Sequence, residues 1–215
     1  MMTETLRVKD CALQVLGVVK GLVSESAAIE KAFDTFQPEK VAVSISREEL
    51  QGLMNMPEDF EPELTRYEEI YAEGLSRFGE VAAPPPCYLA ALELAARKGV
   101  PLIPVDLDEN SYTDLYCAAV PGTTLFRHST RTWLLKHRRF NARTAEEFVR
   151  AWDRAVNSLR GFRTIEDRRA ESMAKGITDA CGEATRVLAV IELERVHDVL
   201  ERLRATSEEA GSEHG

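Results

Sequence analysis

The sequence of 215 residues lacks any apolar run long enough to cross a membrane. One of its cleanest apolar runs, residues 187–191, is far shorter than the roughly 20 residues that a membrane-spanning helix needs. The first ten residues, MMTETLRVKD, also lack the apolar core of a signal peptide. We therefore expect no membrane partner and a cytoplasmic location.

Clustered cysteines are missing as well. The chain has four cysteines, Cys11, Cys87, Cys117 and Cys181, which lie far apart and form no C-x-x-C pair. Such pairs are typical of metal and redox sites. Without a signal peptide or close spacing, these residues are expected to be reduced and mostly buried thiols.

The chain has no excess of positive charge. It contains 27 Lys and Arg against 36 Asp and Glu, a formal net charge of -9. Proteins that bind nucleic acids non-specifically are usually basic, so no nucleic-acid partner is favoured. One basic stretch, residues 127–143, fits the solvated face of an amphipathic helix, with Phe126, Trp133 and Phe140 on another face. Contact with phosphate or RNA through this stretch is the alternative.

Common site motifs are absent too. The sequence contains no G-x-x-x-x-G-K-[ST], no G-x-G-x-x-G and no G-x-S-x-G. These absences disfavour the common nucleotide-binding and serine-hydrolase functions. The histidines show no ligand spacing; they are His128, His137, His197 and His214.

Short apolar runs alternate with helical segments along the chain. Runs of branched apolar residues predict strands at residues 11–19, 41–45, 100–105 and 186–191. Helices are predicted between them and after the last one, including residues 64–78, 87–97 and 194–203. This alternation indicates an α/β fold, a mixed or parallel β-sheet of four or more strands flanked by helices. We expect a single domain over residues 1–204 and a disordered tail over residues 205–215.

Some helix starts are marked by capping residues. Ser46 with Glu49, and Thr144 with Glu147, match the capping-box pattern, in which each side chain satisfies a free backbone N–H. Thr164 predicts the start of a further helix.

Four stretches, in order, match motifs of one protein family. The first is LGVVKGLVSES at residues 16–26, and the second is a P-x-x-V-x-V strand at residues 38–43. The third is a helix with two alanines before a strand that ends in Asp-Leu-Asp at residues 106–108, with Thr113 beyond it. The fourth is an R-x-x-x-M-A helix at residues 169–174, followed by VLAVIELERVHDVL. Over residues 16–203 the chain thus resembles the TraB/PrgY family of pheromone-shutdown and TIKI-like proteins.

The chain departs from that family at its two G-x-x-H turns. The resemblance aligns the first histidine with Lys20 or, after a one-residue shift, Gly21. It aligns the second histidine with Arg195 and the glycine of that turn with Glu192. TIKI-like relatives imply a metal-dependent hydrolase, but lysine and arginine are cationic donors with no lone pair for a metal. We therefore predict no metal, no cofactor and no catalytic residue.

Polar residues at the strand ends are the candidate site. Lys20, Glu192, Glu194 and Arg195 follow the first and last strands, and ligands of open α/β sheets bind at such ends. The cluster is either a site for a polar or anionic ligand, or an ion-pair network. His197 is a weaker candidate, reaching the site only if the last helix starts early.

Two carboxylates near the end of another strand are further candidates. Asp106 and Asp108 either bind a cation or act as acid and base; alternatively, Asp108 caps a helix and Asp106 makes turn hydrogen bonds. The resemblance adds Ser44, at the position of a family glutamate, and Arg169. The predicted ligand-binding residues are Lys20, Ser44, Asp106, Asp108, Arg169, Glu192, Glu194 and Arg195.

The resulting functional hypothesis is a non-catalytic TraB-like protein with a regulatory role. It would bind a small polar or anionic ligand or a protein partner, and a homodimer is the default assembly. The alternatives are a divergent hydrolase that uses the strand-end acids, and a phosphate- or RNA-contacting factor.

Overall fold

Five strands form one mixed β-sheet in the computed structural model, which describes residues 2–57, 59–135 and 140–212. They are β1 (Met2–Val8), β2 (Cys11–Val18), β3 (Lys40–Val43), β4 (Leu102–Pro104) and β5 (Arg186–Glu192), arranged in the order β1-β2-β5-β3-β4. Strand β1 runs antiparallel to β2, and the other neighbouring pairs are parallel. The predicted α/β fold is confirmed, and the predicted strands differ from the observed ones only at their ends.

The apolar pattern of the sequence does not predict strand β1. Its residues alternate between half-buried and exposed, with Met2 and Leu6 packed against the core and Thr3 and Thr5 in solvent. This alternation is typical of an edge strand with one face in water. The strand covers the outer edge of β2.

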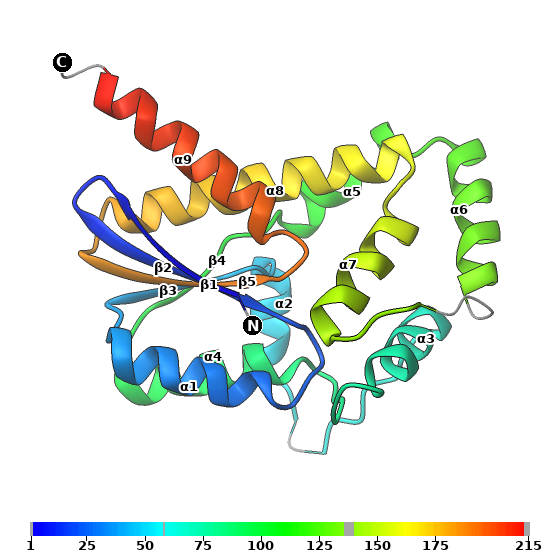
Figure 1. Cartoon of the computed structure of the whole chain (residues 1–215), viewed down its shortest axis with the longest axis horizontal. Coiled ribbons are helices and arrows are strands. Elements are labelled where there is room, and N and C mark those ends of the chain that lie inside the picture. Colours follow the sequence, from blue (N-terminus) through cyan, green and yellow to red (C-terminus); the bar gives the residue numbers. More distant parts are fainter. Residues whose placement is uncertain (1, 58, 136–139, 213–215) are drawn as a thin grey trace.

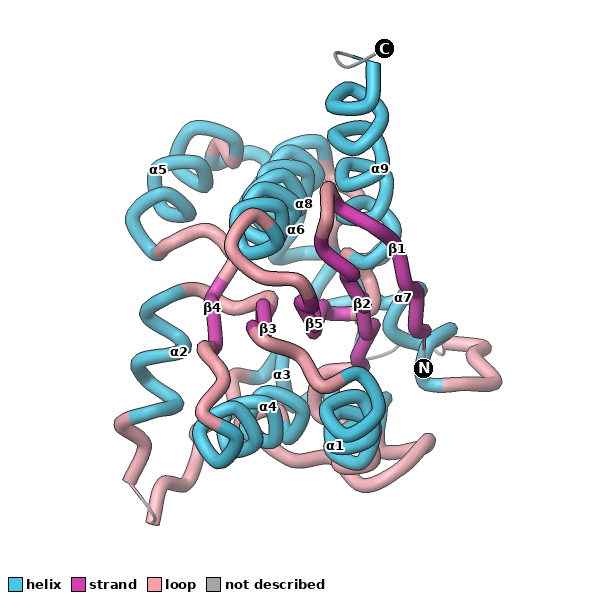
Figure 2. Tube along the Cα trace, turned by 90° about the vertical axis from the view of Figure 1, so that its left-hand side faces the viewer, coloured by secondary structure: helices cyan, strands magenta, loops and turns pink. Residues whose placement is uncertain are grey.

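Helices cover both faces of the sheet (Figures 1 and 2). Helices α1 (Glu25–Phe36) and α4 (Pro86–Lys98) pack on one face, and α8 (Arg160–Cys181) and α9 (Val196–Ser212) pack on the other. Each pair encloses an apolar core with the sheet. The nearly continuous apolar sequences of β2, β3 and β5 follow from this burial on two faces.

The remaining helices lie toward the carboxyl ends of the parallel strands. Helices α2 (Arg47–Met54) and α5 (Glu109–Ala119) follow β3 and β4 in the chain. Helices α3 (Arg66–Leu75), α6 (Gly122–Leu135) and α7 (Ala145–Val156) lie beyond the carboxyl edge of the sheet, to the right in Figure 1. A third apolar core joins α3 and α7 to the turn after β2 through Val19 and Leu22.

The helix starts confirm some sequence predictions and correct others. Ser46 and Glu49 form the predicted capping box of α2. Thr144 caps α7 by accepting from the backbone N–H of Glu147, but the Glu147 carboxylate accepts from the backbone N–H of Arg143, so the box is incomplete. The start predicted at Thr164 is wrong, because α8 already begins at Arg160.

The C-terminal helix is longer than predicted. Helix α9 continues to Ser212, so it extends into the segment expected to be a disordered tail, and residues 213–215 lie outside the described ones.

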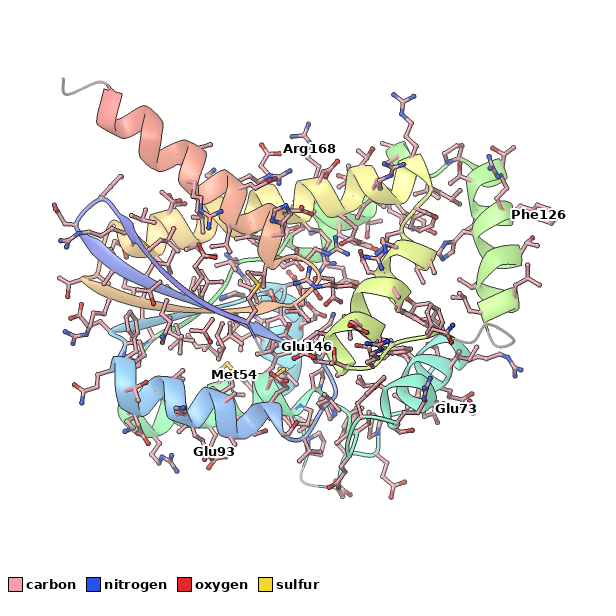
Figure 3. The ribbon with its side chains drawn as sticks, viewed as in Figure 1. Met54, Glu73, Glu93, Phe126, Glu146 and Arg168 are labelled. Atoms are coloured by element: carbon pink, nitrogen blue, oxygen red, sulfur yellow. The ribbon has the colours of Figure 1, made fainter. Side chains whose placement is uncertain are left out.

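The basic stretch at residues 127–143 is only partly described. Helix α6 contains its first half and ends at Leu135, and residues 136–139 lie outside the described ones. The Phe126 side chain is 75% exposed and points away from the molecule (Figure 3), whereas Phe140 is buried. The two rings therefore do not share the buried face of one helix. Within the described ranges, no helix combines the length and the apolar character needed to cross a bilayer.

Candidate functional site

A cleft of about 1470 Å³ opens at the carboxyl edge of the sheet. Its floor is made by residues at the ends of β2, β3 and β5, together with one face of α8. Helices α2, α3, α4 and α7 contribute to its walls. The parallel register of β2 and β5, which pairs Val18 with Glu192, brings the turn after β2 next to the turn after β5.

Glu192 lies at the centre of the floor. Its side chain is 1% exposed and faces two cations, with Oε2 at 2.5 Å from Lys20 Nζ and Oε1 at 2.6 Å from an Arg169 nitrogen. Its backbone N–H donates to Ser44 Oγ at 2.9 Å. Burial raises the pKa of Glu192, but Arg169 and Lys20 outweigh burial and the pKa is lowered. Glu192 is therefore an ionised carboxylate held between two positive charges.

Arg169 joins three carboxylates. Its Nη2 lies 2.5 Å from Asp106 Oδ2, and its Nη1 lies 2.9 Å from Glu166 Oε2, in addition to its contact with Glu192. Glu166 and Arg169 are three residues apart on α8 and so share one face of that helix. Burial raises the pKa of Glu166 to about 7, although Arg169 partly offsets the rise.

Arg195 also pairs closely with two carboxylates, although its Nε makes no hydrogen bond among the described residues. Its guanidinium pairs with Asp153 of α7, and its Nε lies 2.9 Å from Glu166 Oε2. The side chain is 6% exposed. Of the cations expected to hold an anionic ligand, Arg169 and Arg195 belong to the ion-pair network that was the alternative interpretation. Only Lys20, with 36% of its side chain exposed, presents substantial surface to the cleft.

Glu194 differs from the other carboxylates of the floor. Among the described residues, no lysine or arginine nitrogen lies within 4.0 Å of its carboxyl group. Its Oε2 atom, like Oε1 of Glu192, is buried and has no hydrogen-bond partner among them, but Oε1 of Glu192 lies 2.6 Å from an Arg169 nitrogen. Burial, followed by the negative charge of Glu192, raises the pKa of Glu194 to about 7, and Lys20 opposes this rise. The floor therefore contains two carboxyl groups, Glu166 and Glu194, that change protonation near neutral pH.

Aromatic side chains form a wall above these groups. The rings of Tyr67 and Trp152 lie 5.1 Å apart, and those of Tyr71 and Trp152 lie 5.5 Å apart. Trp152 Nε1 donates to Tyr67 Oη at 2.7 Å, and Tyr71 Oη donates to the Lys20 carbonyl oxygen at 3.4 Å. On another side of the cleft, buried Tyr88 shares a hydrogen bond of 2.9 Å with Ser44 Oγ.

The cleft is acidic overall. Among the described residues, three basic residues line it, Lys20, Arg169 and Arg195, against eight acidic residues: Glu49, Glu68, Glu73, Glu80, Asp153, Glu166, Glu192 and Glu194. An excess of one sign of charge in a cleft concentrates ligands of the opposite sign. This balance disfavours the anionic ligand expected from the sequence.

Most of the predicted site residues come together, but two candidates do not. Ser44, Glu194 and the charged network described above converge on or beside the cleft floor. Asp108 instead caps α5, accepting from the backbone N–H of Ser111 at 2.9 Å, and is exposed. His197 lies on α9 with 66% of its side chain exposed, 3.3 Å from Glu201, because α9 starts late rather than early.

Other residues of the site were missed from the sequence. Glu166 had a detectable signal, because it lies one helical turn before the predicted Arg169. Tyr67 and Tyr71 show the spacing of a helix face, which is as common in cores as in sites. Asp153 had no signal at all, because only the packing of α7 brings it to Arg195.

The residues at the strand ends do not suit a divalent metal ion. Lys20 and Arg195 offer no lone pairs, and Glu192 is already neutralised by two cations. In the part of the chain that the structure describes, no group of three or more His, Cys, Asp or Glu side chains is arranged to hold a metal ion.

Neither protein-family models nor curated proteins give a match to this chain.

Proposed function

We propose that this chain is a ligand-binding protein that holds a small polar organic molecule in the cleft at the carboxyl edge of its sheet. The observation that carries the proposal is the cleft itself, which combines a volume of about 1470 Å³ with a charged floor and an aromatic wall. Ligand sites in proteins typically have volumes of roughly 300–1,000 Å³ and pair apolar lining with a few polar groups. The cleft is large enough for an elongated ligand.

The proposal includes a relationship to the TraB/PrgY family. It is supported by the convergence of the four TraB-like stretches at the cleft floor. Lys20 of the first stretch, Ser44 just after the second, Asp106 of the third, and Arg169 and Arg195 of the fourth meet on or beside the cleft floor. In this proposal the metal chemistry of TIKI-like relatives is replaced by a network of fixed charges.

Lys20 gives a direct test, because it is the floor cation with the most exposed side chain. Lys20→Met removes a charge from the cleft, while Arg169 still neutralises Glu192, so the fold is retained. A panel of cationic, neutral and anionic polar molecules is first screened for compounds that raise the melting temperature of the wild type. We expect these compounds to bind Lys20→Met with altered affinity. The matched control is Lys40→Met, which removes a lysine paired with Glu183 outside the cleft. Equal effects of both substitutions, or no binding by any charge class, would contradict the proposal.

A divergent hydrolase is the second candidate, favoured by one observation. Glu166 and Glu194 have pKa values raised to about 7, and they lie beside the ionised Glu192. Carboxyl groups with such separated pKa values can serve as acid and base at neutral pH. This candidate predicts turnover of an ester, amide or glycoside panel that is lost in both Glu166→Gln and Glu194→Gln. Turnover that survives both substitutions would rule it out.

A further inference from the structure

Glu194 is the acidic residue of the cleft floor that has no cationic partner among the described residues. Glu192, Glu166 and Asp153 each face a lysine or arginine within 4.0 Å. Oε2 of Glu194 and Oε1 of Glu192 are both buried with no hydrogen-bond partner among the described residues, but Glu192 has an ion pair with Arg169. Glu194 has no such pair, is half-buried as a residue, and lines the cleft. A buried carboxyl oxygen without a partner costs free energy, which a ligand that donates a hydrogen bond would recover.

The surroundings of this carboxyl group indicate which donor fits. Glu194 lines the same cleft as Tyr67, Tyr71 and Trp152, the residues of the aromatic wall. The faces of tyrosine and tryptophan rings attract cations. A carboxylate next to aromatic rings is therefore suited to an ammonium group, which needs both negative charge and polarisable surface.

The charge of the whole cleft points the same way. Eight acidic residues against three basic ones attract a positively charged ligand before any contact is made. Four of these acids lie on the helices and loops around the opening, namely Glu49, Glu68, Glu73 and Glu80. An elongated ligand with more than one positive charge would meet carboxylates along the cleft as well as at its floor.

We infer that the ligand of this cleft is a small organic amine whose ammonium group binds the Glu194 carboxylate against Tyr67 and Tyr71. This inference rests on the proposed function and names the class of ligand. No covalent step is involved.

Three four-carbon probes that differ in their end groups test this inference: putrescine, butane-1,4-diol and succinate, with spermidine as a longer amine. Isothermal titration calorimetry with the full chain should show binding of putrescine, tighter binding of spermidine, and no comparable binding of the diol or succinate. Glu194→Gln should weaken binding of the amines by roughly tenfold or more. Glu93→Gln, which removes an acid on the outer side of α4 (Figure 3), should leave their affinity unchanged.

The outcomes separate the inference from the proposed function. Binding of succinate or the diol that depends on Lys20, with no binding of amines, would overturn the amine assignment and leave the ligand-binding function standing. Equal weakening by Glu194→Gln and Glu93→Gln would show that amines bind only to the general negative charge of the chain, and would also overturn it. Absence of binding by all four probes would count against both proposals.

The pH dependence of binding provides a test that needs no substitution. The titratable and charged groups that line the cleft floor and aromatic wall with Glu194 are Glu192, Glu166, Lys20, Arg169, Arg195, Tyr67 and Tyr71. With a pKa of about 7, Glu194 is largely protonated at pH 6 and ionised at pH 8, whereas the amines stay charged throughout. Amine affinity should therefore rise between pH 6 and pH 8, with release of a proton on binding. A flat profile, or a rise of the same size in Glu194→Gln as in the wild type, would overturn the assignment to Glu194; a smaller rise in that variant is the share expected from Glu166.

Discussion

At the scale of single residues, the two cations that share Glu192 have different roles. Lys20 has 36% of its side chain exposed, and Glu192 is its only ion-pair partner among the described residues. Arg169 is 18% exposed and neutralises Asp106 and Glu166 in addition to Glu192. Without Lys20, Glu192 still has its ion pair with Arg169. Without Arg169, the carboxylates of Asp106, Glu166 and Glu192 each lose the cation that they share. Arg169 is therefore the residue on which the stability of the site depends most.

This difference predicts that Arg169→Met destabilises the protein by about 3–5 kcal/mol, the usual cost of breaking a buried ion pair from one side. The neighbouring Arg168 is a matched control, because it points to the outer side of α8 (Figure 3) and its one ion-pair partner among the described residues is the exposed Glu171. Arg168→Met should change the free energy of unfolding by less than about 1 kcal/mol. Urea unfolding followed by circular dichroism measures both, and similar losses in the two variants would contradict a structural role for the network.

At the scale of elements, strands buried on both faces were the easiest to predict. Strands β2 and β5 are short runs of branched apolar residues. Burial on both faces requires such a nearly continuous apolar sequence, which makes these strands recognisable. Strand β1 was missed because half of its residues face water. The start of α8 was missed because its N-cap residue, Leu159, makes no side-chain capping bond, whereas Thr164 matches a capping pattern within the helix.

The candidate site was predictable only for residues whose place at the edge of the sheet follows from the direction of the strands. Lys20 and Ser44 follow parallel strands, and Glu192 is the last residue of one, and the carboxyl ends of such strands must lie at one edge. The aromatic wall depends on how α3 and α7 pack against each other, which no local pattern specifies. The neutralisation of Arg169 and Arg195 was equally unpredictable from the sequence, because the acids that pair with them come from α7, α8 and the ends of β4 and β5.

The contact between α5 and α8 gives a prediction at this scale. A Cβ atom at Gly161 would lie 2.3 Å from the carbonyl oxygen of Ala119, which is backbone and cannot rotate away. Gly161→Ala should therefore separate the two helices and destabilise the protein by about 1–3 kcal/mol, as overpacking does. Gly52→Ala is the control, since a Cβ atom there meets nothing within 4 Å and should stabilise α2 by about 0.5–1 kcal/mol. Thermal unfolding of the two variants should show shifts of opposite sign, and a neutral Gly161→Ala would refute the close contact.

At the scale of the whole molecule, the sheet couples two apolar cores into one structure. The core under α8 and α9 contains Cys11 and Cys181, and the core under α1 and α4 contains Cys87. Successive residues of β2 and β5 point alternately into these two cores. Local unfolding of either layer of helices would therefore expose strands against which the other layer packs. Cys117 lies outside both cores and is exposed.

This coupling predicts how the four thiols react. In the native protein, Cys117 should be modified rapidly by a thiol reagent, whereas the other three react only after unfolding. Burial raises the pKa of Cys87 to about 12 and also raises that of Cys181, which suppresses the reactive thiolate. Across a urea series, Cys11, Cys87 and Cys181 should become reactive in one cooperative transition, located by mass spectrometry of the labelled peptides. Modification of Cys87 at a lower urea concentration than Cys11 and Cys181 would mean that the α1–α4 layer opens by itself, and the sheet would then not couple the two cores.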